Sequence, residues 1–154
     1  MAPEDSFPAA LDDAVVSYQY LLSKGYGPSK ILLCGESAGG GLCYALCLRL
    51  KQLKLPLPCG IIAISPWTDL TQSGATFDEN RDNDPSLSKE LLDFYSAGYT
   101  QNPKNPLCSP LFGDLKDLPP SLLFVGGDEI LLDDAQRLHQ KLLDAGCKSK
   151  LYIA

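Results

Sequence analysis

Apolar residues recur along the chain with two different spacings, and the two kinds of segment alternate. Where they return every three or four positions, as in Leu11, Ala14, Val15 and Tyr18, they predict a helix. Where they form a short unbroken run, they predict a strand buried on both faces of a parallel sheet. The predicted strands are residues 31–34, 60–65, 121–125 and 150–153. The predicted helices are residues 11–22, 38–53, 85–98 and 134–145.

Residues with strong local preferences mark the ends of these segments. Gly25 and Gly146 lie just beyond two of the predicted helices, where glycine commonly ends a helix. Asp84 is the expected cap of the third helix, with Pro85 at its first position. Residues 68–83 are polar and rich in turn formers, and we expect an irregular segment there.

Strands that alternate with helices predict an α/β fold, with a parallel sheet of about four strands and crossover helices. In such sheets, functional residues gather at the carboxyl ends of the strands. Ser37 follows the first predicted strand, and Asp128 and Glu129 follow the third. We therefore expect a nucleophile and a carboxylate at the same edge of the sheet.

The run Gly35-Glu36-Ser37-Ala38-Gly39 matches the Gly-x-Ser-x-Gly pattern of a nucleophile elbow, between a predicted strand and a predicted helix. A sharp strand-to-helix turn presents the serine Oγ, and the flanking glycines are expected to avoid clashes with neighbouring backbone. The Ala38 amide, unpaired at the start of the helix, would then donate to a developing oxyanion. A chance match in an ordinary turn is the alternative.

Several segments beyond the pentapeptide resemble the hormone-sensitive-lipase-like branch of the α/β-hydrolases, also called alpha/beta hydrolase fold-3. They are Ala2-Pro3-Glu4, Phe7-Pro8-Ala9-Ala10, Gly35 to Gly40, Ser65-Pro66-Trp67-Thr68-Asp69-Leu70, Leu118-Pro119-Pro120 and Gly127-Asp128-Glu129-Ile130-Leu131-Leu132-Asp133. The resemblance implies that residues 1–154 form a single, partial α/β-hydrolase domain, from the central to the C-terminal part of the catalytic domain. It also implies hydrolysis of carboxylic esters, with short acyl groups, by a Ser–His–acid triad through an acyl-enzyme, without cofactor or metal.

The family's acid motif, Asp-x-Leu-x-Asp, aligns with Glu129 at the acid position, because Leu131 and Asp133 then follow at the right steps. A glutamate can orient and stabilise an imidazolium as an aspartate does. Asp128 is the alternative, and either carboxylate could simply be a solvated residue near a helix start.

Two parts of the family's machinery lie outside the matching segments. The oxyanion motif, a His-Gly-Gly-Gly-like loop, precedes the Ala-Pro-Glu segment in the family, and the catalytic histidine follows the last strand. His139, the only histidine, falls within a predicted helix and is expected to be structural. We therefore expect the chain alone to be almost inactive, with an exposed sheet edge that favours self-association. A non-catalytic ligand-binding protein or pseudo-enzyme of the same fold is the alternative.

Composition and charge argue against macromolecular partners and leave the small-molecule ester that the resemblance implies. The net charge of −6 argues against nucleic acid and anionic membrane surfaces, and no apolar run is long enough to span a membrane. The N-terminal residues do not resemble a signal peptide, and the six cysteines have no metal-site spacing. Cys34, Cys43, Cys47 and Cys59 are expected to act as small apolar residues, so we expect a reduced, cytoplasmic protein. Trp67, Phe94 and Tyr95 are expected to accommodate an apolar acyl or alcohol group.

Overall fold

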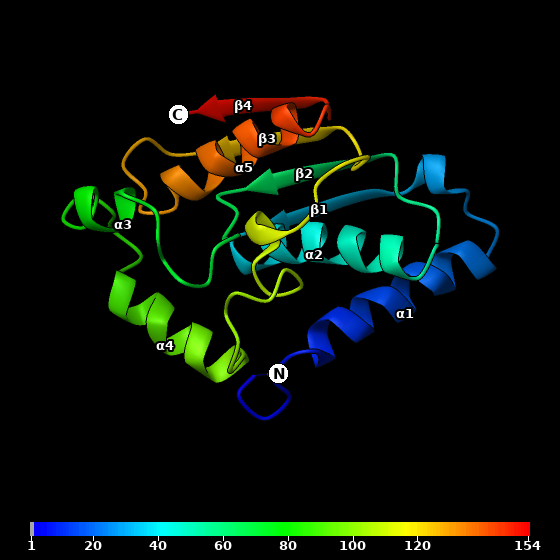
Figure 1. The fold of residues 1–154 in the computed structure, drawn as a ribbon, viewed down its shortest axis with the longest axis horizontal. Helices are drawn as coiled ribbons and strands as arrows, with labels where there is room; N and C mark the ends of the chain where they lie inside the picture. Colours follow the sequence, from blue (N-terminus) through cyan, green and yellow to red (C-terminus); the bar gives the residue numbers. More distant parts are fainter. Residues whose placement is uncertain (1) are drawn as a thin grey trace.

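The sheet of the expected α/β fold has four parallel strands in the order β1-β2-β3-β4 (Figure 1), in a computed structural model that describes residues 2–154. The strands are β1 (Leu32–Glu36), β2 (Gly60–Ile64), β3 (Ser121–Val125) and β4 (Ser149–Ile153). The helices are α1 (Ala9–Ser23), α2 (Ala38–Gln52), α3 (Thr76–Glu79), α4 (Lys89–Tyr99) and α5 (Leu132–Asp144), with short 3-10 turns at Pro28–Lys30 and Pro110–Phe112. Because all four strands run the same way, their carboxyl ends meet at one edge.

Most predicted elements are confirmed within a few residues, and one helix start is wrong. Helix α4 begins at Lys89, where the Ser88 side chain accepts a hydrogen bond from the Leu91 amide at 3.2 Å. Asp84 instead binds the amides of Ser86 and Leu87 in a turn before the helix, both at 2.9 Å. The polar segment before Asp84 also contains the short helix α3, which the sequence pattern did not predict.

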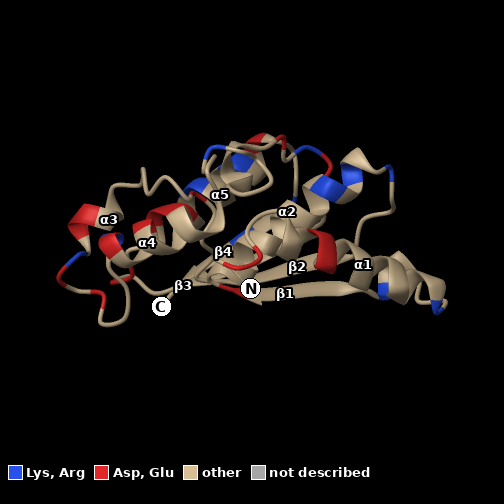
Figure 2. Ribbon diagram, turned by 90° about the horizontal axis from the view of Figure 1, so that it is seen from below, with Lys and Arg blue, Asp and Glu red and all other residues tan. Residues whose placement is uncertain are grey.

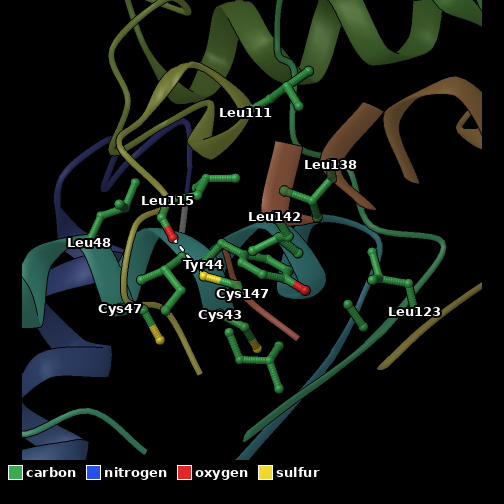
Figure 3. Close-up of a cluster of buried hydrophobic side chains, with 13 residues drawn as sticks. Cys43, Tyr44, Cys47, Leu48, Leu111, Leu115, Leu123, Leu138, Leu142 and Cys147 are labelled. Atoms are coloured by element: carbon green, nitrogen blue, oxygen red, sulfur yellow. Dashed lines mark hydrogen bonds between the residues drawn. The ribbon is translucent and has the colours of Figure 1, made fainter. Parts of the chain in front are cut away.

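Helices α2 and α5 cover one face of the sheet and form the main core with it (Figure 3). Tyr44 of α2 and Leu138 and Leu142 of α5 are fully buried against Leu123 of β3. The Cys147 thiol belongs to the same cluster and donates to the Leu115 carbonyl oxygen at 3.2 Å. This packing fixes the sheet relative to the helices that begin at its carboxyl edge.

The other face of the sheet carries apolar side chains that no helix covers among the described residues. Figure 2 shows α2, α3, α4 and α5 on one side of the strands, and α1 at the level of the sheet. Phe124 and Tyr152 stack on this open face with ring centroids 5.3 Å apart, and Leu32 of β1 is 52% exposed. The expectation of strands buried on both faces is therefore wrong for this chain.

Two of the expected apolar cysteines are exposed, and the open face explains one of them. Cys43 and Cys47 are buried in the core, but Cys34 and Cys59 are exposed. Cys34 lies two residues after Leu32 on β1, so the two side chains share the uncovered face of the sheet. Cys59 lies outside the strands, directly before β2. Within residues 2–154, none of the helices has the length and apolar character that crossing a membrane requires.

Candidate functional site

Ser37 occupies a strained turn between the last residue of β1 and the first residue of α2. Its backbone has φ 51° and ψ −120°, a conformation that residues with a side chain rarely adopt. Three hydrogen bonds hold this backbone: the Ser37 amide donates to Ile64 at 2.9 Å, and its carbonyl accepts from Gly41 at 3.1 Å and Trp67 at 2.9 Å. The expected tight turn is thus confirmed. Hydrogen bonds to β2, to α2 and to the segment after β2 hold its strained backbone in place.

The glycines around Ser37 differ in what their missing side chains allow. A Cβ atom on Gly35 would lie only 2.8 Å from the Gly40 amide nitrogen, and one on Gly41 would overlap the Trp67 carbonyl. A Cβ atom on Gly39 would meet nothing within 4 Å. The expected steric reason is therefore confirmed for Gly35 and wrong for Gly39, because the close approaches in α2 fall on the two glycines that follow, Gly40 and Gly41.

The Ala38 amide stands at the start of α2 beside the Ser37 side chain. Ala38 is the first residue of the helix, so its N–H has no intrahelical acceptor. No other acceptor within residues 2–154 binds it, and the residue is exposed. This amide is therefore available to a ligand oxygen, and the positive end of the helix dipole adds to its attraction for an anion.

The two candidate acids follow β3 at the same edge of the sheet as Ser37, and their environments differ. The Glu129 carboxylate is partly buried, and its Oε1 accepts a hydrogen bond from the Gly126 amide at 2.7 Å. A Cβ atom on Gly126 would lie 2.8 Å from that oxygen, so glycine leaves room for this contact. Asp128 is exposed, and no group in the described part of the chain binds its carboxylate. Glu129 is therefore the more fixed of the two.

His139 lies on α5 and contacts the wrong end of the sheet for catalysis with Ser37. Its Nδ1 is 2.8 Å from the hydroxyl oxygen of Ser149, the first residue of β4. Ser37 follows the last residue of β1, and the strands are parallel, so the two side chains belong to opposite edges of the sheet. The expected structural role of this histidine agrees with its contact.

A pocket of about 810 Å³ opens beside Ser37, Ala38 and Gly39. Trp67, Phe94 and Tyr95, which the sequence analysis singled out, all line it. Its other walls are almost entirely apolar and come from the start of α1, from α2 and α4, and from the segment around Leu107. Such a pocket favours an apolar group bound next to the serine.

A buried carboxylate that sequence reasoning missed holds one wall of this pocket. Asp134 is fully buried, and its Oδ2 accepts from the amides of Thr68 at 2.7 Å and Asp69 at 2.9 Å. These residues follow Trp67, whose amide binds the Ser37 carbonyl. Burial, with a smaller contribution from the Asp69 charge, raises the pKa of Asp134 to about 7. In Asp69 itself, hydrogen bonds from Ser73 and Thr71 and the Arg137 charge outweigh burial and lower the pKa.

We expect Asp134 to make the chain less stable as the pH rises from about 4 to 7. The Asp134 carboxyl binds its proton more tightly in the folded chain, where its pKa is about 7, than in the unfolded chain, where the ordinary pKa is 3.8. The stability of the fold is therefore highest below about pH 4 and falls as the pH rises to about 7. The Asp134→Asn variant keeps an acceptor for both amides and cannot ionise, so it should lose this part of the pH dependence. Urea unfolding at pH 5 and pH 8 measures it, and the wild type should lose about 3 kcal/mol of stability between them, because only the part of the shift between pH 5 and about 7 falls in this range.

The exposed Asp144 on the same helix provides the control. Asp144→Asn should keep the wild-type dependence between pH 5 and pH 8, because an exposed carboxylate lacks the burial that raises the pKa of Asp134. An Asp134→Asn variant that lost stability between these pH values as steeply as the wild type would contradict the assignment.

Comparisons with a family profile, with known relatives and with solved structures all match this chain to hydrolases. Residues 1–153 match a family profile described as alpha/beta hydrolase fold. An acetyl-hydrolase of Streptomyces hygroscopicus is 42% identical over 148 residues, which cover 94% of this chain and 49% of that protein. An esterase of Acinetobacter venetianus is 42% identical over 157 residues, with 99% and 52% covered. The solved structure of an esterase from the bacterial hormone-sensitive lipase family gives a TM-score of 0.97 at 44% identity, again with 99% and 52% covered. The chain therefore spans about half the length of the relatives it matches.

Proposed function

This chain belongs to the α/β-hydrolase fold family, in its hormone-sensitive-lipase-like branch, and we propose that it carries the nucleophile and the acid of a carboxylic ester hydrolase. The observation that supports this most directly is the strained backbone of Ser37, with φ 51°, between a strand and a helix. Strain of this kind persists only where the surrounding structure enforces it, and it is common at catalytic residues. The names of the relatives, an acetyl-hydrolase and an esterase, favour an ester as substrate.

Each group in the site has a role in acyl transfer. The Ser37 Oγ attacks the ester carbonyl carbon, and the carbonyl oxygen gains negative charge near the free amide of Ala38. A histidine takes the serine proton and returns it to the leaving alcohol, and Glu129 stabilises the imidazolium in between. Collapse of the tetrahedral intermediate leaves an acyl group on Ser37, which water removes by the same steps. The apolar pocket beside Ser37 accommodates the short acyl or alcohol group.

The base in this mechanism is not His139, because its contact with Ser149 belongs to the opposite edge of the sheet. We assign this role, and the second oxyanion donor, to groups outside residues 2–154. Without them, the serine hydroxyl is a weak nucleophile, so the chain alone should hydrolyse esters barely above the background rate.

A completed chimera tests this function. The part of the Acinetobacter venetianus esterase that has no counterpart here is joined to this chain in its native order, and the rates with p-nitrophenyl acetate and butyrate are measured. Hydrolysis that depends on Ser37 supports the proposal. A folded chimera without hydrolysis contradicts it.

We also propose that β1, the outermost strand of the sheet, mediates self-association of the isolated chain. Within residues 2–154 it pairs with a strand on one side only, so its other side is open. Leu32 and Cys34 are exposed on this strand, and an unpaired edge beside an apolar face favours pairing with a second copy. Sedimentation equilibrium should show a dimer or larger species that the Leu32→Lys/Cys34→Lys double variant weakens. Val16→Lys, at an exposed apolar residue of α1, is the control. A chain that sediments as a monomer would contradict this proposal.

A further inference from the structure

Three side chains from the segment that contains α3 bind the backbone of the loop after β3. The Asn80 amide group donates to the carbonyl oxygens of Gly127 at 3.0 Å and Glu129 at 2.8 Å. Asp84 Oδ2 accepts from the Ile130 amide at 2.9 Å. Thr76, which is buried, donates through its hydroxyl to the Ile130 carbonyl oxygen at 2.8 Å. These contacts join residues 46 to 54 positions apart in the sequence.

We propose that Asn80 and Asp84 are positioning residues, which hold Glu129 in the orientation that a triad acid requires. The inference rests on the proposed function, because it assigns Glu129 the role of the acid. Asn80 binds the carbonyl groups of Gly127 and Glu129, and Asp84 binds the amide of the residue that follows. The backbone is thus fixed on both sides of Glu129, and the Gly126 amide holds its carboxylate.

The chemistry of these two side chains suits this role, because Asn80 binds through both protons of its amide nitrogen and Asp84 binds through both of its oxygens. Both contacts of Asn80 use the Nδ2 group, which has two protons to donate. Both oxygens of Asp84 are occupied, Oδ2 by Ile130 and Oδ1 by the amides of Ser86 and Leu87. Partial burial works to raise the pKa of Asp84, but these three amides outweigh it and lower the pKa. The carboxylate therefore stays ionised, and remains an acceptor, at neutral pH.

Two nearly isosteric substitutions reverse these contacts. Asn80→Asp replaces a donor with a carboxylate that faces two carbonyl oxygens. Asp84→Asn leaves one side-chain oxygen for three amides and turns an NH₂ group toward an N–H donor. Each change removes hydrogen bonds that fix the backbone around Glu129, with almost no change in side-chain volume. The exposed neighbours Asn83 and Asp82 allow controls with the same change of charge, Asn83→Asp and Asp82→Asn.

The experiment measures the four variants in the completed chimera with p-nitrophenyl butyrate. Asn80→Asp and Asp84→Asn should each lower kcat by about 10–100-fold, the cost of a misplaced catalytic group, while KM changes by less than about twofold. Because a displaced acid no longer stabilises the imidazolium, the acidic limb of the kcat/KM profile should also move to lower pH. A merely structural role would reduce the amount of active enzyme without moving this limb. The two controls should match the parent.

Hydrogen exchange of the isolated chain provides a second measurement that does not need activity. Asn80→Asp and Asp84→Asn should speed exchange of the amides in residues 126–133, and the controls should leave it unchanged. If both variants keep the parent kcat and pH profile while Glu129→Gln abolishes hydrolysis, the positioning role is overturned and the proposed function stands. If Ser37→Ala leaves hydrolysis intact, the proposed function fails first, and the positioning role fails with it. If Glu129→Gln alone leaves hydrolysis intact, Glu129 is not the acid, so the positioning role is overturned while the nucleophile assignment stands.

Discussion

The Ser37→Ala variant of the completed chimera should hydrolyse p-nitrophenyl butyrate at least about 10³–10⁴-fold more slowly than its parent. The substitution removes the oxygen that we propose forms the acyl-enzyme, and leaves the Ala38 amide and the pocket unchanged. KM should therefore change little, and kcat should carry the loss. Initial rates over a range of substrate concentrations, with unfolding midpoints to show that the variant is folded, measure it.

Ser65 provides a matched control for this prediction. Like Ser37, it directly follows a strand at the carboxyl edge of the sheet, and its φ is also positive, at 43°. It precedes an irregular segment instead of a long helix, so it lacks the helix-start amide that a nucleophile needs beside it. Ser65→Ala should keep most of the activity. Equal losses in the two variants would show that strand-end serines matter for folding and would remove the case for Ser37.

The Glu129→Gln variant of the chimera should lose about 10⁴-fold in kcat, the scale on which loss of a triad acid's charge acts. Glutamine keeps an oxygen that can accept from the Gly126 amide, so the loop should stay folded. It cannot stabilise the imidazolium that forms when the base takes the serine proton. The rate should fall across the whole pH range in which the parent is active.

Asp128→Asn removes the neighbouring charge and provides the comparison. Asp128 is exposed, so its replacement should change kcat by less than about threefold, the small effect typical of screened surface charges. The reverse result, a large loss in Asp128→Asn and a small one in Glu129→Gln, would assign the acid to Asp128 and leave the fold and the nucleophile unaffected.

Local sequence determined the elements and the turn that carries Ser37. Short apolar runs predicted the four strands. Their alternation with helical segments predicted that the strands are parallel, because few other topologies connect such elements. Gly35 and Ser37 predicted the strained turn because its requirements, a missing side chain and a following helix, are local. The glycine stops at Gly25 and Gly146 are local too, and both residues have positive φ in the structure.

Tertiary contacts decided how the polar residues act. Asp84 matches the pattern of a helix cap, yet its second oxygen binds Ile130, 46 positions away. Asn80 and Asp134 carry no local signal, because their partners belong to other strands and loops that approach only after folding. The pentapeptide suggested that a side chain at Gly39 would clash, but the close contact falls on Gly41, because the Trp67 backbone passes next to Gly41 and not next to Gly39. Spacing along the chain reveals periodic faces and turns, whereas a buried hydrogen bond between distant segments depends on how those elements pack.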